Sequence, residues 1–129
     1  MKKLLPLIII FVLLVGFVIH TGAQESSVSE EEITYKHNDV KVKYRDDLVD
    51  IGHPRFEYLD TSKSSFVRGA WYDEENNYMV IKLKDTYYHY CGLPLDIWTS
   101  FKKADSFGIF YNTYIKGRYD CRINYVPEY

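Results

Sequence analysis

The alternation of apolar and polar positions predicts three short strands in the middle of the chain. Phe66 to Tyr72 has a strand-like composition, and Tyr78 to Leu83 alternates with its apolar side chains on one face. The third segment, Thr86 to Cys91, directs Tyr88 and Tyr90 to one face of the strand and its odd-numbered residues to the other. Turn-forming residues separate the three segments, which favours an antiparallel meander.

A helical pattern follows the third strand directly. Pro94 suits the first turn of a helix that continues to about Ala104, because its missing N–H would have no partner there. Ser106 is placed to cap a second short helix, and Gly117 is suited to end it. The expected apolar face of that helix consists of Phe107, Phe110, Tyr111, Tyr114 and Ile115. The sequence thus predicts an α+β fold in which a three- or four-stranded antiparallel meander packs against two short C-terminal helices.

Four sequence elements occur in a distinctive order. They are Tyr88-x-Tyr90, the Leu93-Pro94 helix start, the turn from Ser106 to Gly108, and the segment from Phe110 to Ile115. Together they resemble the KTSC family, a small domain named after a C-terminal extension of some lysyl-tRNA synthetases. The resemblance covers Ser62 to Cys121, and we expect a KTSC-like domain over residues 62–126. It implies an RNA-binding role and no established catalytic activity.

Two regions are expected immediately before this domain. Residues 24–36 should form an acidic linker, because Gln24 to Glu32 contains Glu30-Glu31-Glu32 and has almost nothing apolar to bury. Residues 37–61 should form an edge strand and a connector. In the strand, Val40, Val42 and Tyr44 alternate with basic residues. The connector, Asp46 to Thr61, is expected to be ordered and anchored by Phe56, Tyr58 and Leu59.

The first 23 residues have the pattern of an export leader. Lys2 and Lys3 precede an apolar run from Leu4 to Ile19, and Thr21-Gly22-Ala23 supplies small residues after it. This pattern predicts a secretory signal peptide, residues 1–23, that is cut after Ala23. The alternative is an uncleaved membrane anchor at residues 4–19. In both cases the domain is expected outside the cytoplasm, either periplasmic, secreted or held at the membrane surface.

Charge is unevenly distributed along the chain. Without the leader, 14 basic and 18 acidic residues remain, with a formal charge of −4. Residues 24–60 hold ten acidic and five basic residues, whereas residues 61–129 hold eight acidic and nine basic ones. General nucleic-acid binding normally requires a strong basic excess. The charge therefore argues against the RNA-binding role that the resemblance implies.

The two cysteines fit an exported domain. A bridge between Cys91 and Cys121 would tie the helical half to the sheet, and closing a loop of about 30 residues stabilises a fold by roughly 3 kcal/mol. We expect this disulfide because oxidising compartments favour such bridges. The alternative is a reactive Cys91 thiol activated by His89, although no third residue is placed to orient the two.

The sequence offers no catalytic set and no metal or cofactor motif. Its histidines are scattered without the spacing of a zinc site, at His20, His37, His53 and His89. Asp73-Glu74-Glu75 could act as a pair of carboxylates, but the neighbouring Asn76-Asn77 favours a solvated hairpin tip. We therefore expect a protein that is not an enzyme and binds no cofactor.

Thirteen tyrosines, all after residue 23, are the remaining candidate chemistry. A surface with stacking rings and charge could bind a single-stranded nucleic acid, a glycan or an acidic peptide. Its candidate residues are Tyr88, Tyr90, Lys102, Lys103, Lys116, Arg118 and Arg122. The alternative is that Tyr88 and Tyr90 form the packing face of the sheet beneath the helices.

Three classes of function follow from these observations. The first is an exported, non-catalytic binding or interaction module whose partner is an envelope or extracellular protein or polymer. The second is an RNA-binding module, which both export and charge disfavour. The third is a small envelope hydrolase or an inhibitor of an envelope enzyme.

Overall fold

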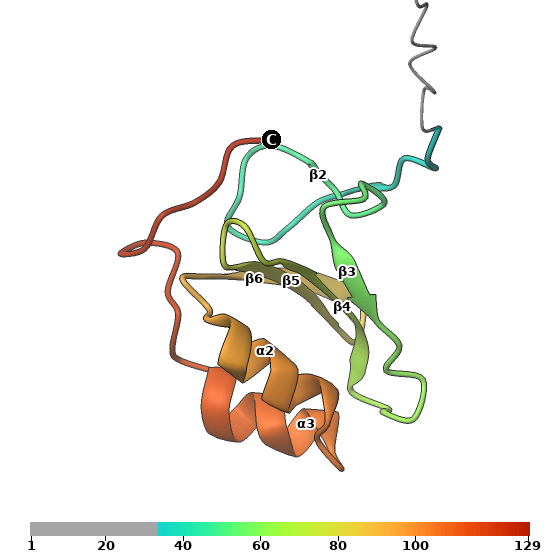
Figure 1. Ribbon diagram of the computed structural model, residues 1–129, viewed down its shortest axis with the longest axis vertical. Helices are drawn as coiled ribbons and strands as arrows, with labels where there is room; N and C mark the ends of the chain where they lie inside the picture. The colour runs from blue at the N-terminus through green and yellow to red at the C-terminus, as the bar shows by residue number, and fades with distance from the viewer. Residues whose placement is uncertain (1–33) are drawn as a thin grey trace, which may run out of the picture. The chain divides into compact units, whose positions relative to one another are not determined.

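A four-stranded antiparallel sheet lies at the centre of the fold, between a layer of helices and a layer of irregular chain (Figure 1). Its strands are β3 (Glu57–Leu59), β4 (Val67–Asp73), β5 (Tyr78–Leu83) and β6 (Thr86–Cys91), hydrogen-bonded in that order. The computed structural model describes residues 34–129, which form one unit. The α+β meander predicted from the sequence is confirmed, and β3 supplies its fourth strand.

The helical layer covers one face of the sheet. It contains α2 (Leu95–Lys102), α3 (Phe107–Phe110) and a π-helical turn, η1 (Tyr111–Ile115). The Oγ atom of Ser106 accepts a hydrogen bond from the N–H of Ile109, so the predicted cap is confirmed. Gly117 follows with a φ of +77°, a conformation that glycine adopts without strain.

One residue of the expected helix face is placed differently. The buried positions are Phe107, Tyr111 and Ile115, which are four residues apart and share a side of the helix. Tyr114 leaves 48% of its surface exposed, so its predicted burial was wrong. The first helix also ends earlier than expected, at Lys102 rather than Ala104.

The core beneath the helices is aromatic and continuous. Trp98 of α2 is fully buried, stacks on Tyr72 of β4 with ring centroids 5.0 Å apart, and contacts Phe101. Its indole N–H donates to Glu57 of β3 at 2.9 Å, which gives a buried polar atom its partner. Lys102 binds the other oxygen of the same carboxylate at 2.7 Å. Packing and these two polar contacts join α2 to the sheet.

The opposite face of the sheet is covered without helices. A two-stranded ribbon, β1 (Asp39–Val40) with β2 (Val49–Asp50), and the C-terminal tail close over it. The side chains of this second core include Val42, Val49, Phe56, Tyr78, Val80 and Cys91. Because both faces of β5 are covered, five of its six residues are buried.

The predicted edge strand from Val40 to Tyr44 is wrong in its extent. β1 is only two residues long, and Val42 makes a single parallel bridge to Tyr87 of β6. The chain then turns: Tyr44 has a φ of +67°, and its side chain is 83% exposed. The N–H of Arg45 bonds back to the carbonyl of Val42. This turn ends the alternation of apolar and basic side chains, because a residue in the left-handed backbone conformation cannot continue a strand.

The predicted connector is ordered, as expected, whereas the predicted hairpin tip differs from the expectation at Asp73. Residues 46–61 contain β2 and β3, and of the proposed anchors Phe56 is buried whereas Tyr58 is 56% exposed. Asp73, expected at a solvated tip, is 1% exposed and accepts a hydrogen bond from the Tyr129 hydroxyl at 2.8 Å. The tail thus supplies the partner that a buried carboxylate requires.

Several predictions concern residues outside this description. The leader, residues 1–23, and most of the acidic linker, residues 24–36, precede residue 34. Within residues 34–129, no helix combines the length and apolar character needed to cross a membrane.

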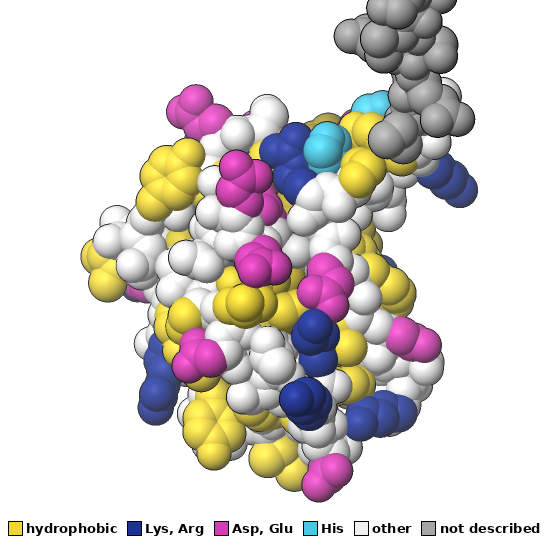
Figure 2. Space-filling model, viewed as in Figure 1, with side chains coloured by type: hydrophobic (Ala, Val, Ile, Leu, Met, Phe, Trp, Pro, Cys, Tyr) yellow, Lys and Arg dark blue, Asp and Glu magenta, His cyan; other side chains and the backbone are white. Residues whose placement is uncertain are grey.

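On the face drawn in Figure 2, acidic and basic side chains are interspersed and do not gather into a single patch of one sign.

Candidate functional site

A cleft of about 780 Å³ lies along the outer edge of β6. We call it the β6 cleft. Its floor is formed by Tyr88, His89 and Tyr90. The loop 44–47 forms one wall, and the segment that carries Gly117, Arg118, Asp120, Cys121, Arg122 and Val126 forms the other. A volume of this size is typical of ligand sites in proteins.

The main chain at the floor of the cleft has two polar groups without partners. The carbonyl of Tyr87 accepts from the N–H of Lys43, and the N–H of Cys91 donates to the carbonyl of Tyr119, both at 2.8 Å. Both groups point away from β5. Alternate residues of a strand direct their polar groups to the same side, so His89 also directs its N–H and C=O outward. Neither group has a hydrogen-bond partner among residues 34–129.

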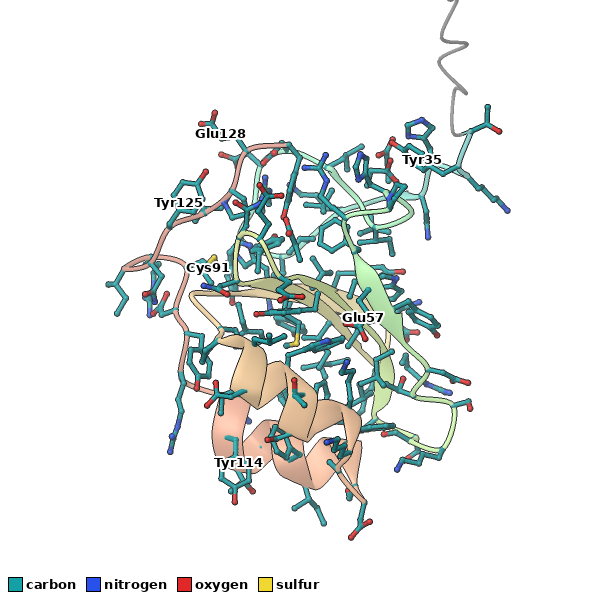
Figure 3. The ribbon with its side chains drawn as sticks, in the orientation of Figure 1. Tyr35, Glu57, Cys91, Tyr114, Tyr125 and Glu128 are labelled. Atoms are coloured by element: carbon teal, nitrogen blue, oxygen red, sulfur yellow. A yellow bond between two sulfur atoms is a disulfide. The ribbon has the colours of Figure 1, made fainter. Side chains whose placement is uncertain are left out.

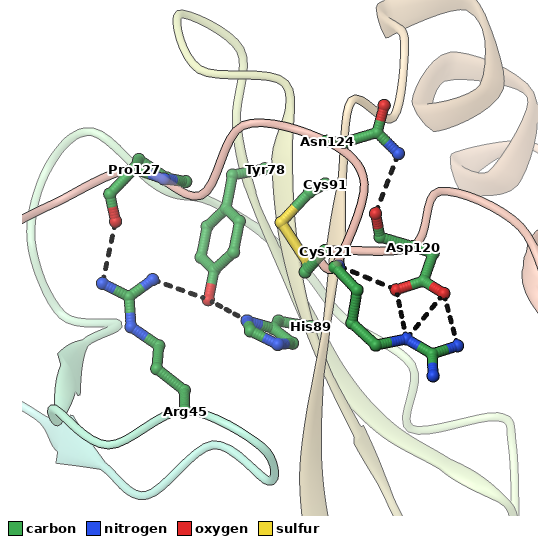
Figure 4. The surroundings of a disulfide bond; sticks show 9 residues. Arg45, Tyr78, His89, Cys91, Asp120, Cys121, Asn124 and Pro127 are labelled. Atoms are coloured by element: carbon green, nitrogen blue, oxygen red, sulfur yellow. Dashed lines mark hydrogen bonds and ion pairs between the residues drawn. A yellow bond between two sulfur atoms is a disulfide. The ribbon is translucent and has the colours of Figure 1, made fainter.

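A buried polar network supports one wall of the cleft (Figure 4). Arg45 is 6% exposed, and its guanidinium donates to the Tyr78 hydroxyl at 3.2 Å and to the carbonyl of Pro127 at 2.8 Å. Asp47 balances its charge through two hydrogen bonds. The network joins the loop 44–47, the sheet and the tail.

His89 contacts the same network. Its Nδ1 atom lies 3.0 Å from the Tyr78 hydroxyl. Burial, and then the nearby positive charge of Arg45, lower the pKa of His89 from its ordinary value. Burial also raises the pKa of Tyr78 to about 12. The pair is therefore a neutral imidazole and a neutral phenol near pH 7.

The disulfide predicted between Cys91 and Cys121 is confirmed in the structure. It fastens the tail to the end of β6 and so holds the second wall of the cleft. A ring nitrogen of His89 and the two sulfur atoms lie within 4.8 Å of one another, which is the geometry of a metal-ligand group. The sulfur atoms are bonded to each other, however, and thiolates are the form in which cysteine binds metals.

The structure brings only some of the proposed binding residues together. Tyr88, Tyr90 and Arg118 line the β6 cleft. Lys102 lies near β3 at the opposite edge of the sheet, where it binds Glu57. Lys103 and Lys116 are exposed and do not line the cleft, whereas Arg122 does and pairs with Asp120 at 2.6 Å.

The two tyrosines of the Tyr-x-Tyr motif differ in their surroundings. Both lie on the helix-covered face, opposite Ile81 and Met79 respectively. The Tyr90 hydroxyl forms a hydrogen bond with the Tyr111 hydroxyl, and burial raises the pKa of Tyr90. The Tyr88 ring has the ammonium group of Lys43 5.6 Å from its centroid. Tyr90 therefore serves packing as well as lining the cleft.

Other tyrosines lie outside the cleft. Tyr114 projects from the outer side of the helices and Tyr125 from the C-terminal tail (Figure 3). Tyr114 is 48% exposed and Tyr125 is 69% exposed. These two rings therefore lie apart from the β6 cleft, whereas Tyr44, which is 83% exposed, lines it together with Tyr88 and Tyr90.

Sequence reasoning did not find the contribution of the loop 44–47. The alternation predicts Arg45 on the charged face of a strand, yet its guanidinium is buried against Tyr78 and the tail. Nothing in the local sequence indicates this contact, because its partners are 33 and 82 residues away. The positive φ at Tyr44 that places the loop also has no glycine or asparagine to signal it.

A second hollow, of about 370 Å³, lies between residues 63–66 and the start of α3. The hydroxyl groups of two of its three lining serines already serve the fold. Ser64 Oγ accepts from the N–H groups of Phe66 and Val67, and Ser106 Oγ caps α3. The β6 cleft is the stronger candidate, because its floor presents main-chain groups that have no partner in the described part of the chain.

The fold and the cleft define a small α+β domain with a candidate binding site at the edge of its sheet. Comparison with known families is more specific: the model of the KTSC domain matches residues 63–119. The chain therefore carries a KTSC domain, as its motifs indicated. No curated protein and no solved structure matches the chain. The match includes the floor of the β6 cleft, whereas the loop 44–47 and the disulfide-bonded Cys121 lie outside it.

Proposed function

We propose that this protein is an exported, non-catalytic binding module and that the β6 cleft is its ligand site. The observation that carries the proposal is the main-chain N–H and C=O of His89, which have no hydrogen-bond partner within residues 34–129 and lie at the floor of a cleft of about 780 Å³. Edge groups of this kind bind partners readily. Tyr88 supplies an aromatic surface beside them, and Arg118 supplies a positive charge.

The chemistry of the cleft supports binding rather than catalysis. Arg45 is paired with Asp47, and Arg122 with Asp120, so these charges compensate each other. His89 uses Nδ1 in its contact with Tyr78, and the cysteines are joined. A general base needs an adjacent nucleophile or substrate proton to act on, and the lining residues offer no such pairing.

Export is supported by two independent features. Residues 1–23 have the pattern of a signal peptide, and Cys91 and Cys121 form a disulfide that is stable in oxidising compartments. We therefore place the partner in the envelope or outside the cell, as a protein or other polymer.

Nucleic-acid binding is the less favoured function. The proposed cations are spread over opposite edges of the sheet, and Lys102 is already bound to Glu57. The β6 cleft is lined by three arginines and three aspartates, and two of the arginines are paired with aspartates, so it lacks the basic excess that phosphate binding normally requires.

Affinity capture with a matched pair of variants tests the proposal. The full chain, exported with its own leader, is immobilised and exposed to a cell-envelope fraction. We expect one set of partners to be retained by the wild type and by Lys103→Ala, and to be lost with Arg118→Ala. Both substitutions remove an exposed cation, but only Arg118 lines the cleft. Equal retention by all three proteins would contradict a ligand site in the cleft.

A further inference from the structure

We infer that the β6 cleft binds a polypeptide in extended conformation, one residue of which pairs with the main chain of His89. This inference rests on the proposed function, because it names the ligand class of the same cleft. It differs from recognition by side chains alone, since the first contacts would be two hydrogen bonds to the backbone of the sheet.

The direction of the free groups selects the ligand chemistry. The N–H and C=O of His89 point to the same side, away from β5. An extended amino-acid residue also directs its own C=O and N–H to one side, so it can accept from His89 and donate to it at once. A trans amide, such as the acetamido group of an amino sugar, directs its two polar groups in opposite directions and can satisfy only one. A sugar-phosphate backbone has no N–H to donate.

The neighbouring hydrogen bonds limit how much of the ligand can pair. Lys43 occupies the edge at Tyr87, and Tyr119 occupies it at Cys91. The open edge therefore comprises only residues 88–90, which at ~3.3 Å per residue is about 10 Å of strand. About three ligand residues fit this length. The chain on either side must leave through the mouth of the cleft, so the ligand is a short extended segment and not a complete added strand.

The charges on the walls bias which peptide is bound. Arg118 is exposed and has no ion pair within the described part of the chain. Asp46, on the facing wall, also forms no ion pair within the described residues. A single acidic side chain near Arg118 is favoured, whereas a run of acidic residues would also meet Asp46.

The experiment uses the full chain and a random heptapeptide library with blocked termini. The tightest binder is synthesised again with each backbone nitrogen methylated in turn, which removes one N–H without changing any side chain. We expect methylation at one position to weaken binding about tenfold, because it leaves the His89 carbonyl without a donor. Arg118→Ala should weaken binding, and Lys103→Ala should not.

Amide hydrogen exchange gives a direct readout at the site. In the free protein, the His89 N–H should exchange faster than that of Cys91, which already bonds to Tyr119. Saturation with the peptide should slow exchange at His89 by at least about tenfold. Exchange at Cys91 is expected to change little, so it serves as the internal reference.

Several outcomes would overturn the inference. If methylation leaves the affinity unchanged at every position, the peptide binds without main-chain pairing. The inference would then fail, and the proposed function would stand. A second such outcome is that no peptide binds, whereas an oligomer of N-acetylglucosamine or a single-stranded oligonucleotide does bind and Tyr88→Ala abolishes that binding. The inference would then fail, and the proposed function would stand. If none of the three probes binds, the cleft as ligand site fails together with the inference.

Discussion

The two faces of the central sheet are covered in different ways. On one face, α2, α3 and η1 form a periodic apolar layer over Tyr72, Met79 and Ile81. On the other face, short strands, loops and the tail cover Tyr78 and Val80. The first layer is formed by local elements with repeating patterns. The second depends on contacts between residues far apart in the chain, among them the disulfide and the hydrogen bonds of Arg45.

This difference has a consequence for function. The helix-covered face is held by extensive burial of large side chains, which is not sensitive to any single polar group. The second layer relies on a few specific bonds and also supplies both walls of the β6 cleft. We therefore expect the cleft to respond to changes in redox state or pH that leave the helix-covered core intact.

The largest effect is expected in the helix-covered core. Trp98→Ala should lower the free energy of unfolding by about 3–5 kcal/mol, because it removes a fully buried ring and leaves a cavity against Tyr72. Trp71→Ala is the matched control on the opposite face, where the indole is only half-buried. Chemical denaturation measures both. Equal losses would show that the two faces do not differ in packing as described.

The next effect concerns the bond that holds the tail. Cys121→Ser should lower the free energy of unfolding by about 2–4 kcal/mol, since it releases a closure between residues 30 apart in sequence. Hydrogen exchange should accelerate in residues 119–129 and remain slow in α2. Wild-type protein treated with a reductant should behave in the same way. A tail that stays protected after reduction would contradict the role assigned to the disulfide.

A smaller effect separates the two tyrosines of the motif. Tyr90→Phe should cost about 1 kcal/mol, because it deprives the buried Tyr111 hydroxyl of its partner. Tyr88→Phe should be almost neutral in stability, since its hydroxyl has no hydrogen-bond partner within residues 34–129. Thermal denaturation of the two variants measures the difference. The reverse order of effects would assign the packing role to Tyr88.

The smallest effect is a dependence of stability on pH that arises from His89. Burial and Arg45 lower its pKa below 6.5 in the folded protein, so the unfolded chain takes up a proton at higher pH than the folded one. Neutral His89 therefore contributes its full stabilisation above about pH 6.5, and this is lost as the pH falls toward the folded pKa.

Denaturation between pH 7 and pH 5 measures that contribution. His89→Gln should flatten the slope in this window. Carboxylates such as Glu57, whose pKa is lowered by Lys102 and Trp98, should lose their contribution only below about pH 4.5 and should be unaffected by the substitution. An unchanged slope between pH 7 and pH 5 would contradict a buried neutral imidazole at His89.

The sequence by itself determined the meander, the two helices and the disulfide pairing. Strands β5 and β6 begin and end at the predicted residues, because alternation in Tyr78–Leu83 and Thr86–Cys91 is a local property with a period of two. Ser106 and Gly117 act at the helix ends through their own backbone preferences. The chain has two cysteines, and the expectation that the domain is exported to an oxidising compartment made their bridge predictable.

Only the tertiary structure decided the second layer and the cleft. The burial of Arg45 depends on Tyr78 and Pro127, and the burial of Asp73 depends on Tyr129; each partner is chosen by how the layers close on one another. The open edge at His89 is likewise the result of where Lys43 and Tyr119 stop pairing with β6. Periodicity describes which face of an element is apolar, but it carries no information about which distant segment will cover that face.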